Sequence, residues 1–458
     1  MSISRWRMRT SSACTRPIRI RSARSRHSLA RCCPARCGRR NARCIRALPR
    51  RRSATSPLPS SDTPGVSRAA QEAKASPLLS LLALGNFVVG MGVFVVIGIV
   101  SPIAEALHVT KADAGIVITS YAIAYALLSP VGAALTGSLP RRTVLAGSLG
   151  LFCLGTLLSA LSTSLTMLAL SRLIVALGAA LYTPLSAGVA VAVAPPEERG
   201  RALAKVFAGM TLAQVVGVPL GAWLAYRFGW HAPFFLTAVL AALCALVLVR
   251  TIPRNIHVPA GSVSSILGAL GNLRLMVAVT FTATLMCSVY IVFTFFGPII
   301  EASTGAEAGL LPLYFMLFGL GAVAGNFIGG HLSDRFGPLR TLVLVCLAHM
   351  VLLPLFAVMP WNPWLLGLIV MVWSCFAWCF MPPQQSRLVA IAPSAPALAL
   401  ALNAAMIYAG IAIGSAIGAG LLDWKGLPVL GIAAGISGAV ALVHLLVSDR
   451  LARRRAVI

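Results

Sequence analysis

Arg172 is the residue whose chemistry stands out most, because it is a single arginine inside an otherwise apolar segment. At the rise of an α-helix it lies about 10 Å from the nearer end of that segment. Burying a cation at such a depth in a bilayer is costly, which favours a function such as binding a solute or a coupling ion. The alternative is a side chain that extends to the membrane surface and keeps its charge in water.

Other apolar segments also contain isolated polar and aromatic residues, and we expect these to face a solute cavity with Arg172 rather than lipid. They are Asn86, Tyr121, Tyr125, Tyr182, Gln214, Tyr290, Tyr314, Asn326, Trp378, Asn403 and Tyr408. Tyr121 and Tyr125 are one helical turn apart and share a face. For each aromatic residue the alternative is packing between helices. The set has no carboxylate, which favours a neutral or weakly amphipathic solute over a polyvalent cation.

The elements that must position these residues are membrane-spanning helices. The chain is 58% hydrophobic and 11% charged, whereas soluble domains carry about a quarter charged residues. A helix needs about 20 mostly apolar residues to cross a bilayer, and backbone polar groups in lipid must be paired within it. Twelve such segments are predicted, at residues 78–104, 112–136, 143–163, 165–193, 203–226, 232–251, 273–299, 308–332, 340–359, 362–391, 397–421 and 427–447.

The distribution of basic residues predicts how these helices are oriented. With the N-terminus in the cytoplasm, fifteen Lys and Arg residues fall on the cytoplasmic side of the spans and three on the outer side. Cytoplasmic loops of membrane proteins carry an excess of these residues. Both termini are therefore predicted to be cytoplasmic, in a protein of the inner or plasma membrane.

The two halves of the chain resemble each other at an offset near 196 residues. Ser-Pro-Ile-Ala-Glu-Ala at residues 101–106 corresponds to Gly-Pro-Ile-Ile-Glu-Ala at residues 297–302, and Gly217 corresponds to Gly414 at an offset of 197. An offset of six helices preserves topology, which indicates parallel repeats with a solute site between them near the midplane. The predicted fold class is an all-α integral membrane protein with twelve transmembrane helices in two parallel six-helix repeats.

The predicted domains follow from this repeat and from a basic leader. They are a disordered Arg-rich segment (1–76), a six-helix half (77–252), a cytoplasmic linker (253–272), a second six-helix half (273–448) and a basic tail (449–458). Residues 1–74 hold nineteen of the 38 Lys and Arg residues, so the net charge of +27 does not indicate a nucleic-acid partner. The alternatives for the leader are translated upstream sequence, a transit peptide and a cysteine cluster without the spacing of a zinc site.

The loop after the eighth segment is a candidate gate. Its candidate residues are Gly330, Asp334, Arg335, Gly337 and Arg340. Glycines permit a tight turn and close helix approach, and Asp334 can pair with an arginine or with a helix N-terminus. The alternative is a solvated turn.

The corresponding loop of the first half lacks the acidic residue, because the repeat places Gly137 there and leaves only Arg141 and Arg142 nearby. We therefore expect an asymmetric gate in which Asp334 is the latch. Its expected partner region is the start of the fifth span, at Arg199 and Arg201.

The residues 330–340 resemble the signature G-x-L-x-D-R-x-G-x-x-R of the major facilitator superfamily. Arg172 with Gly178 resembles its R-x(5)-G pattern. The sequence Gly217-Val218-Pro219-Leu220-Gly221 is similar to its antiporter motif on helix 5, where small residues and a proline permit close packing and a kink. Residues 294–298, 321–330 and 384–387 resemble the twelve-helix drug:proton antiporter branch, near arabinose-efflux-permease-like proteins. Among them Gly321, Gly325 and Gly329 fall four apart, so they share one helix face and predict a close helix neighbour. The resemblance covers roughly residues 78–448 and implies proton-coupled efflux of a small organic solute.

Proton antiport usually needs a titrating carboxylate within the membrane, and the apolar segments show none at mid-depth. The remaining coupling candidates are Glu105, Asp113, Arg172 and His349. A single histidine in an apolar helix is also a common hydrogen-bonded packing residue. Either these groups couple transport to protons or the protein is an uncoupled facilitator.

The sequence favours a transporter over the other classes of protein. It has no G-x(4)-G-K-S/T phosphate loop, no metal-ligand spacing and no pair of nucleophile and base, so we expect neither an enzyme nor a cofactor. The expected function is secondary efflux of a drug, sugar or nucleoside, by a monomer in the bilayer. The alternatives are facilitated uptake and a receptor or sensor on a transporter scaffold.

Overall fold

The computed structural model describes residues 64–136, 139–195, 198–252, 268, 270–304, 310–393 and 395–453. These residues form one compact unit. Twelve spans in this part of the chain are long and apolar enough to cross a membrane, as predicted, and no strand occurs in it. Residues 1–63 of the predicted leader and most of the predicted linker lie outside the described residues.

The first six spans are single helices or helices joined end to end. They are α1 (Pro64–Phe94) with η1 (Val95–Ile99) and α2 (Val100–Leu107); α3 (Lys111–Ala114) with α4 (Ile116–Leu135); α5 (Arg141–Ala160); α6 (Leu165–Val193); α7 (Arg199–Leu212) with η3 (Ala213–Gly217) and α8 (Val218–Phe228); and α9 (Ala232–Thr251).

The last six spans follow the same plan. They are α11 (Leu273–Phe293) with α12 (Phe296–Thr304); α13 (Leu311–Phe336); α14 (Pro338–Leu352) with η4 (Leu353–Ala357); α15 (Pro363–Cys379) with α16 (Met381–Ile391); α17 (Pro396–Lys425); and α18 (Pro428–Arg453).

Two helices extend beyond the expected boundaries. Residues 64–76, which the sequence assigns to the leader, are the first turns of α1, because their Ala, Gln, Glu and Lys residues favour a helix. The predicted tail from residue 449 likewise begins as helix, because α18 continues to Arg453. Arg453 forms an ion pair with Asp449 at 2.7 Å.

The fifth span changes its winding just before Pro219. Residues Ala213–Gly217 form a π-helical turn between α7 and α8. Such turns widen the helix locally and often mark functional positions. This turn lies where α13 of the other half packs against the fifth span, since a Cβ added to Gly319 would lie 2.6 Å from the backbone of Val215. The kink expected at Pro219 stays a prediction.

The internal repeat is visible in how the helices pack. A Cβ added to Gly221 on α8 would lie 2.1 Å from Val95 of η1, and one added to Gly418 on α17 would lie 2.9 Å from Ile291 of α11. The two glycines are 197 residues apart and their partners are 196 residues apart. The fifth and eleventh spans thus contact the first and seventh in the same way, which agrees with the predicted repeat.

Three glycines of α13 form the close helix contact that their spacing predicts. Gly321, Gly325 and Gly329 face α15, and a Cβ added to Gly325 or Gly329 would lie 2.1 or 2.2 Å from the carbonyl oxygen of Cys375 or Cys379. Backbones can approach this closely only where no side chain intervenes.

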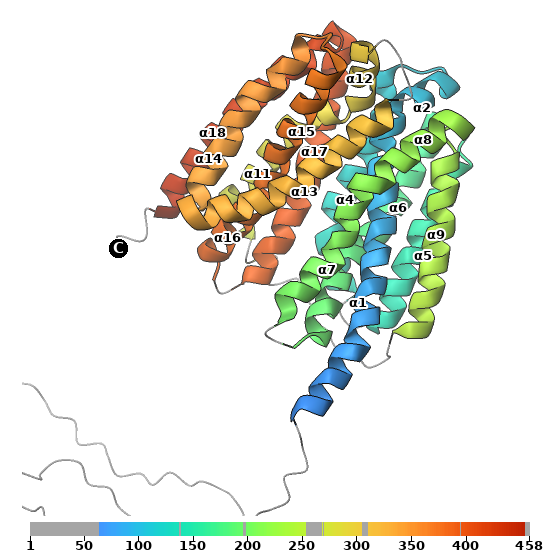
Figure 1. Cartoon of the computed structure of the whole chain (residues 1–458), viewed down its shortest axis with the longest axis vertical. Helices are drawn as coiled ribbons and strands as arrows, with labels where there is room; N and C mark the ends of the chain where they lie inside the picture. Colours follow the sequence, from blue (N-terminus) through green and yellow to red (C-terminus); the bar gives the residue numbers. More distant parts are fainter. Residues whose placement is uncertain are drawn as a thin grey trace, which may run out of the picture. The chain divides into compact units, whose positions relative to one another are not determined.

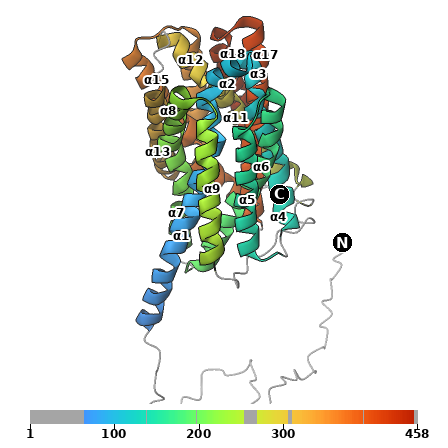
Figure 2. The ribbon, with the colours of Figure 1, turned by 90° about the vertical axis from the view of Figure 1, so that its right-hand side faces the viewer.

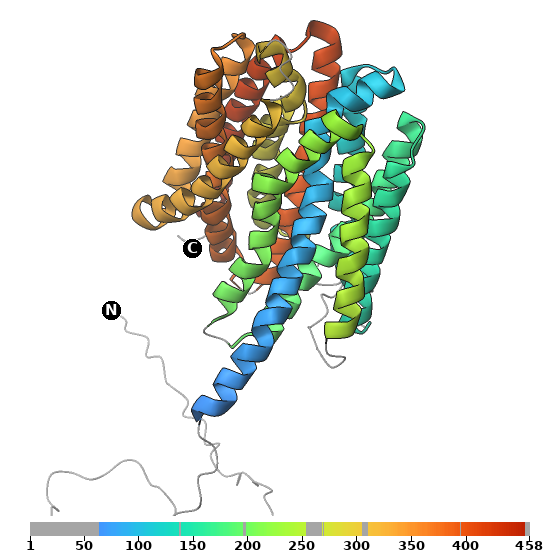
Figure 3. The ribbon, with the colours of Figure 1, turned by 45° about the vertical axis from the view of Figure 1, so that its right-hand side comes forward.

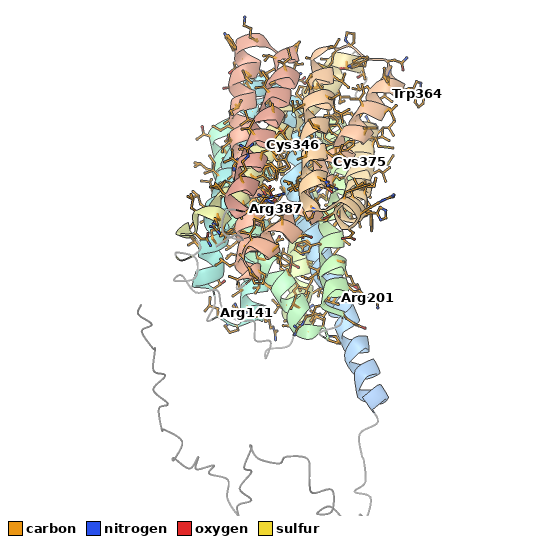
Figure 4. The ribbon with its side chains drawn as sticks, turned by 90° about the vertical axis from the view of Figure 1, so that its left-hand side faces the viewer. Arg141, Arg201, Cys346, Trp364, Cys375 and Arg387 are labelled. Carbon is orange, nitrogen blue, oxygen red and sulfur yellow. The ribbon has the colours of Figure 1, made fainter. Side chains whose placement is uncertain are left out.

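Helices α1–α9 and α11–α18 lie side by side as two groups (Figures 1 and 2). Arg141 and Arg201 lie at one end of the bundle, here called the basic end (Figure 4). Trp364 lies at the opposite end, here called the far end (Figure 4). The end of α13 is inclined away from the start of α7 (Figures 1 and 3).

Candidate functional site

Three tyrosines meet where the two halves join at mid-depth. Tyr125 of α4 stacks on Tyr408 of α17 with ring centroids 3.6 Å apart. Tyr121, one turn earlier on α4, lies 6.0 Å from both rings. The sequence predicted all three as cavity residues, and the structure brings them into one cluster that spans both halves.

Arg172 of α6 lies against this cluster. Its guanidinium carbon is 5.0 Å from the centre of the Tyr121 ring and 5.9 Å from that of Phe234. Its Nη2 donates to the backbone oxygen of Gly92 at 2.8 Å, while Nε and Nη1 are buried without a hydrogen-bond partner. The side chain is 1% exposed, so the guanidinium does not extend to the membrane surface.

Arg172 and the three tyrosines offer two kinds of contact to a solute at one place. Buried N–H groups without partners favour an oxygen acceptor, since an unmet donor in the interior costs about 1–3 kcal/mol. The tyrosine rings offer flat apolar faces with hydroxyl groups. A small solute with a ring and oxygen atoms suits both, and the Tyr125–Tyr408 stack must separate to admit it.

Two other predicted residues, Gln214 and Tyr290, are buried. Gln214 is in the π-helical turn of the fifth span, is buried, and has no partner for its Oε1. Tyr290 of α11 is buried and lies edge-on to Phe293, with ring centroids 5.5 Å apart. A Cβ added to Gly414 of α17 would lie 3.1 Å from the Cβ of Tyr290.

Three predicted cavity residues instead connect helices within one half. Asn86 of α1 donates to Ser186 of α6 at 2.9 Å, and Tyr182 of α6 donates to the backbone oxygen of Leu82 at 3.2 Å. In the second half, Asn403 of α17 accepts from a threonine of α11 at 2.6 Å. These contacts give each residue a structural role in the conformation described.

The remaining predicted cavity residues lie on α13 and α15. Tyr314 donates to the backbone oxygen of Pro363 at 3.1 Å, and Asn326 donates to that of Ala322 at 3.2 Å. Trp378 is half-buried against the apolar core. None of these contacts joins them to the tyrosine cluster.

The coupling candidates other than Arg172 lie apart from this cluster. Glu105 is exposed at the end of α2. Asp113 accepts from the backbone and hydroxyl of Thr110 at 3.2 and 2.8 Å, and so caps the helix that leads into α4. His349 is buried inside the second half, with its Nδ1 3.2 Å from the hydroxyl of Ser288.

The candidate gating loop connects α13 to α14. Gly337 has φ +86°, a conformation that favours glycine and reverses the chain direction. Asp334 is exposed, and within the described chain no ion pair to it lies inside 4.0 Å. Arg335 lies over the Phe336 ring at 5.3 Å, and Gly330 and Arg340 flank the turn.

The basic pair at the corresponding place of the first half starts α5. Arg141 is buried and donates to the backbone oxygen of Thr136 at 3.0 Å, whereas Arg142 is half-buried. Arg141 thus links the ends of α4 and α5 within its own half.

A lateral groove of about 560 Å³ lies between α11, α17 and α18, away from the tyrosine cluster. Its walls are mostly apolar and include Ile413, Ile436 and Val440. His444 at its edge already meets the backbone oxygen of Val277 at 3.0 Å and the hydroxyl of Thr284 at 3.1 Å. Unlike the Arg172 cluster, the groove offers no free buried donor.

Sequence reasoning missed two residues that the structure places at contacts of interest. Trp373 of α15 is buried among aromatic rings, 5.3 Å from Phe318 and 6.1 Å from Phe293, and its indole N–H has no partner. Glu301 of α12 joins elements of the other half. In the sequence, the only feature that marks Glu301 is its match to Glu105 at the repeat offset.

The chain is similar to known transport proteins. A sequence model of the Major Facilitator Superfamily matches residues 82–397. The inner membrane transport protein YdhP of Escherichia coli (strain K12) is 29% identical over 79% of this chain and 94% of YdhP. The uncharacterized MFS-type transporter YbcL of Bacillus subtilis (strain 168) is 29% identical over 74% of this chain and 87% of YbcL.

Two solved structures share the fold. One is a bacterial homologue of the human lysosomal transporter Spinster in an inward-facing, occupied conformation, with a TM-score of 0.66 and 18% identity over 82% of this chain and 97% of that chain. The other is a variant of the nucleoside transporter NupG, with a TM-score of 0.67 and 16% identity over 82% of this chain and 99% of that chain.

Proposed function

This chain belongs to the major facilitator superfamily and is a membrane transporter, and we propose that it exports a small organic solute by alternating access. The observation that carries the proposal is the cluster of Arg172, Tyr121, Tyr125 and Tyr408. A buried guanidinium lies over Tyr121 of the first half, and Tyr125 of that half stacks on Tyr408 of the second half. A site made by both halves changes shape when they rock, so solute binding and access to each side are linked.

The chemistry of this cluster supports a solute of the drug, sugar or nucleoside type. Such molecules present rings or ring-like faces for the tyrosines and oxygen atoms for the free N–H groups of Arg172. A polyvalent cation is disfavoured, because the guanidinium repels it at close range.

The proposed orientation places the basic end in the cytoplasm of a cell with an inner or plasma membrane, in line with the excess of Lys and Arg at that end. Both termini then lie in the cytoplasm. In this scheme the transporter works as a monomer, performs no catalysis and uses the proton gradient.

A second candidate function is an uncoupled facilitator. Within the described residues, no carboxylate lies within ion-pair distance of Arg172. Proton exchange at the solute site would most simply use a titrating carboxylate beside Arg172. The absence of such a partner in the described residues favours the uncoupled facilitator.

Transport by purified protein in proteoliposomes with an imposed pH gradient tests these proposals. A panel of radiolabelled nucleosides, sugars and amphipathic drugs is offered, and uptake into the proteoliposomes is measured. Export coupled to protons predicts uptake that rises when the lumen is more acidic than the outside and stops with a protonophore. Flux that ignores the gradient supports the facilitator, and the absence of flux for every solute class contradicts both.

Replacing Asp334 by asparagine tests the gating loop. If Asp334 is the latch at the basic end, Asp334→Asn slows transport about tenfold, because a charged hydrogen bond contributes roughly 1.5–3 kcal/mol. The matched control is Asp449→Asn, which removes another carboxylate at the same end of the bundle. A transport rate for Asp334→Asn equal to that of the parent rejects the latch.

Replacing Tyr408 by leucine tests the tyrosine cluster. Tyr408→Leu removes a ring that we propose stacks on the solute, so we expect the apparent affinity for solute to fall about tenfold, in line with an aromatic contribution of about 0.5–1.5 kcal/mol beyond burial. Tyr408→Phe keeps the ring and should stay within about threefold of the parent. Equal affinities for both variants would mean that the ring does not contact solute.

A further inference from the structure

Glu301 is a single carboxylate of the second half that contacts three elements of the first half. It lies near the end of α12 at the far end of the bundle and accepts from Ser101 of α2 at 2.6 Å and from Lys111 of α3 at 3.0 Å. It also accepts from the hydroxyl of Tyr226 on α8. The first, second and fifth spans are therefore all connected to the seventh through one side chain.

The burial of Glu301 fits a contact that is shielded from water rather than a solvated ion pair on the surface. The Glu301 side chain is 16% exposed, while Lys111 is 39% exposed. A carboxylate that is mostly withdrawn from water needs its lone pairs met by donors, and here one ammonium and two hydroxyl groups meet them. Hydrogen bonds to an ionised acceptor are roughly twice as strong as neutral ones.

An apolar layer lies next to this contact and also joins the halves. A Cβ added to Gly98 of η1 would lie 3.3 Å from the Phe315 ring of α13, and one added to Gly115 would lie 2.9 Å from the Phe295 ring. Both phenylalanines are buried. Glu301 and its three donors thus belong to a packed junction at the far end.

The residue that the repeat makes equivalent to Glu301 does not form a second junction of this kind among the described residues. Glu105, which matches Glu301 at the repeat offset, is exposed and forms no ion pair inside 4.0 Å with any residue that the structure describes. Asp334 at the basic end is likewise exposed. Glu301 therefore bonds across the halves at the far end, whereas Asp334 forms no ion pair inside 4.0 Å with any residue that the structure describes.

We infer that Glu301, with Ser101, Lys111 and Tyr226, is the clasp that keeps the two halves closed at the far end, and that release of this clasp opens the path for solute there. The inference rests on the proposed alternating access. It assigns to one carboxylate the role of stabilising the state in which the far end is closed.

A distance measurement between the halves tests the clasp without using any solute. Spin labels are placed at Ala106→Cys on α2 and Ala302→Cys on α12, two exposed positions beside the clasp, in the full-length chain with its native cysteines replaced. The Glu301→Gln variant keeps the size of the side chain and removes its charge. We expect the ratio of long to short distances to rise about tenfold, a typical coupling between conformational states.

The matched control is Asp423→Asn, which removes an exposed carboxylate of α17 at the same end and should leave the distances unchanged. Lys111→Gln and Tyr226→Phe each remove one contact and should give intermediate ratios, which also guards against a folding defect in Glu301→Gln. Distances in Glu301→Gln identical to those of the parent would overturn the clasp. A distance change without any solute flux would leave the clasp standing and count against the proposed export.

Discussion

Replacing Arg172 by methionine is expected to lower transport about 100-fold while the protein keeps or gains thermal stability. The loss of transport follows because the variant lacks the buried donors proposed to hold the solute, and a hydrogen bond to a charged group contributes up to about 3 kcal/mol. Stability should not fall, because Nε and Nη1 have no partner and replacing a poorly compensated buried charge by an apolar side chain is often neutral or stabilising. Transport in proteoliposomes and Tm in detergent measure the two effects.

Two further variants show whether the effect belongs to this site. Arg172→Lys keeps a positive charge but loses the planar set of donors, so a rate close to that of Arg172→Met would assign the role to the guanidinium rather than to the charge. Arg227→Gln removes an exposed arginine from the end of α8 and should transport as the parent does. Transport by Arg172→Met at the parental rate would rule out a role for this side chain in solute binding.

The Gly325→Leu variant is expected not to accumulate as a folded protein. A Cβ at this position would lie 2.1 Å from the carbonyl oxygen of Cys375 and 2.9 Å from its carbonyl carbon. These are backbone atoms, so no rotamer change can relieve the overlap, and α13 and α15 would have to move apart. Overpacking of a close contact costs about 1–3 kcal/mol or more, a large share of the about 5–15 kcal/mol that stabilises a typical protein.

The neighbouring Ala324 provides the matched control, since it is exposed on the same helix. Ala324→Leu adds the same side chain on the lipid-facing side and should be folded and active. Size-exclusion profiles and yields of the two variants give the comparison. A monodisperse Gly325→Leu protein with parental Tm would mean that α13 and α15 can separate without cost.

Much of the fold could be predicted from the sequence because its signals are local or periodic. Twelve apolar stretches of sufficient length predict twelve spans, since the bilayer sets the minimum length. The spacing of Gly321, Gly325 and Gly329 predicts a close helix neighbour, and only the identity of that neighbour, α15, required the structure. The π-helical turn at Ala213–Gly217 has no such signal, because neither hydropathy nor residue spacing marks a local change in helix winding.

The direction in which a buried polar side chain points is much harder to predict from the sequence. Asn86 and Tyr125 both occupy apolar segments, but Asn86 bonds to α6 of its own half while Tyr125 stacks on the other half. The difference depends on helix rotation, which hydropathy does not determine. Likewise Glu105 and Glu301 are equivalent in the repeat, and only the three-dimensional contacts separate the exposed residue from the bonded one.

The uncompensated cation at Arg172 also places electrical charge inside the membrane. A potential of 100 mV does about 2.3 kcal/mol of work on one charge that crosses the whole bilayer, and a charge held within a span feels part of that field. Any displacement of α6 along the membrane normal is therefore favoured or opposed by the resting voltage while the site is empty. A neutral solute of the proposed type leaves the charge of Arg172 in place, so voltage would act on the loaded step as well as on the return of the empty protein.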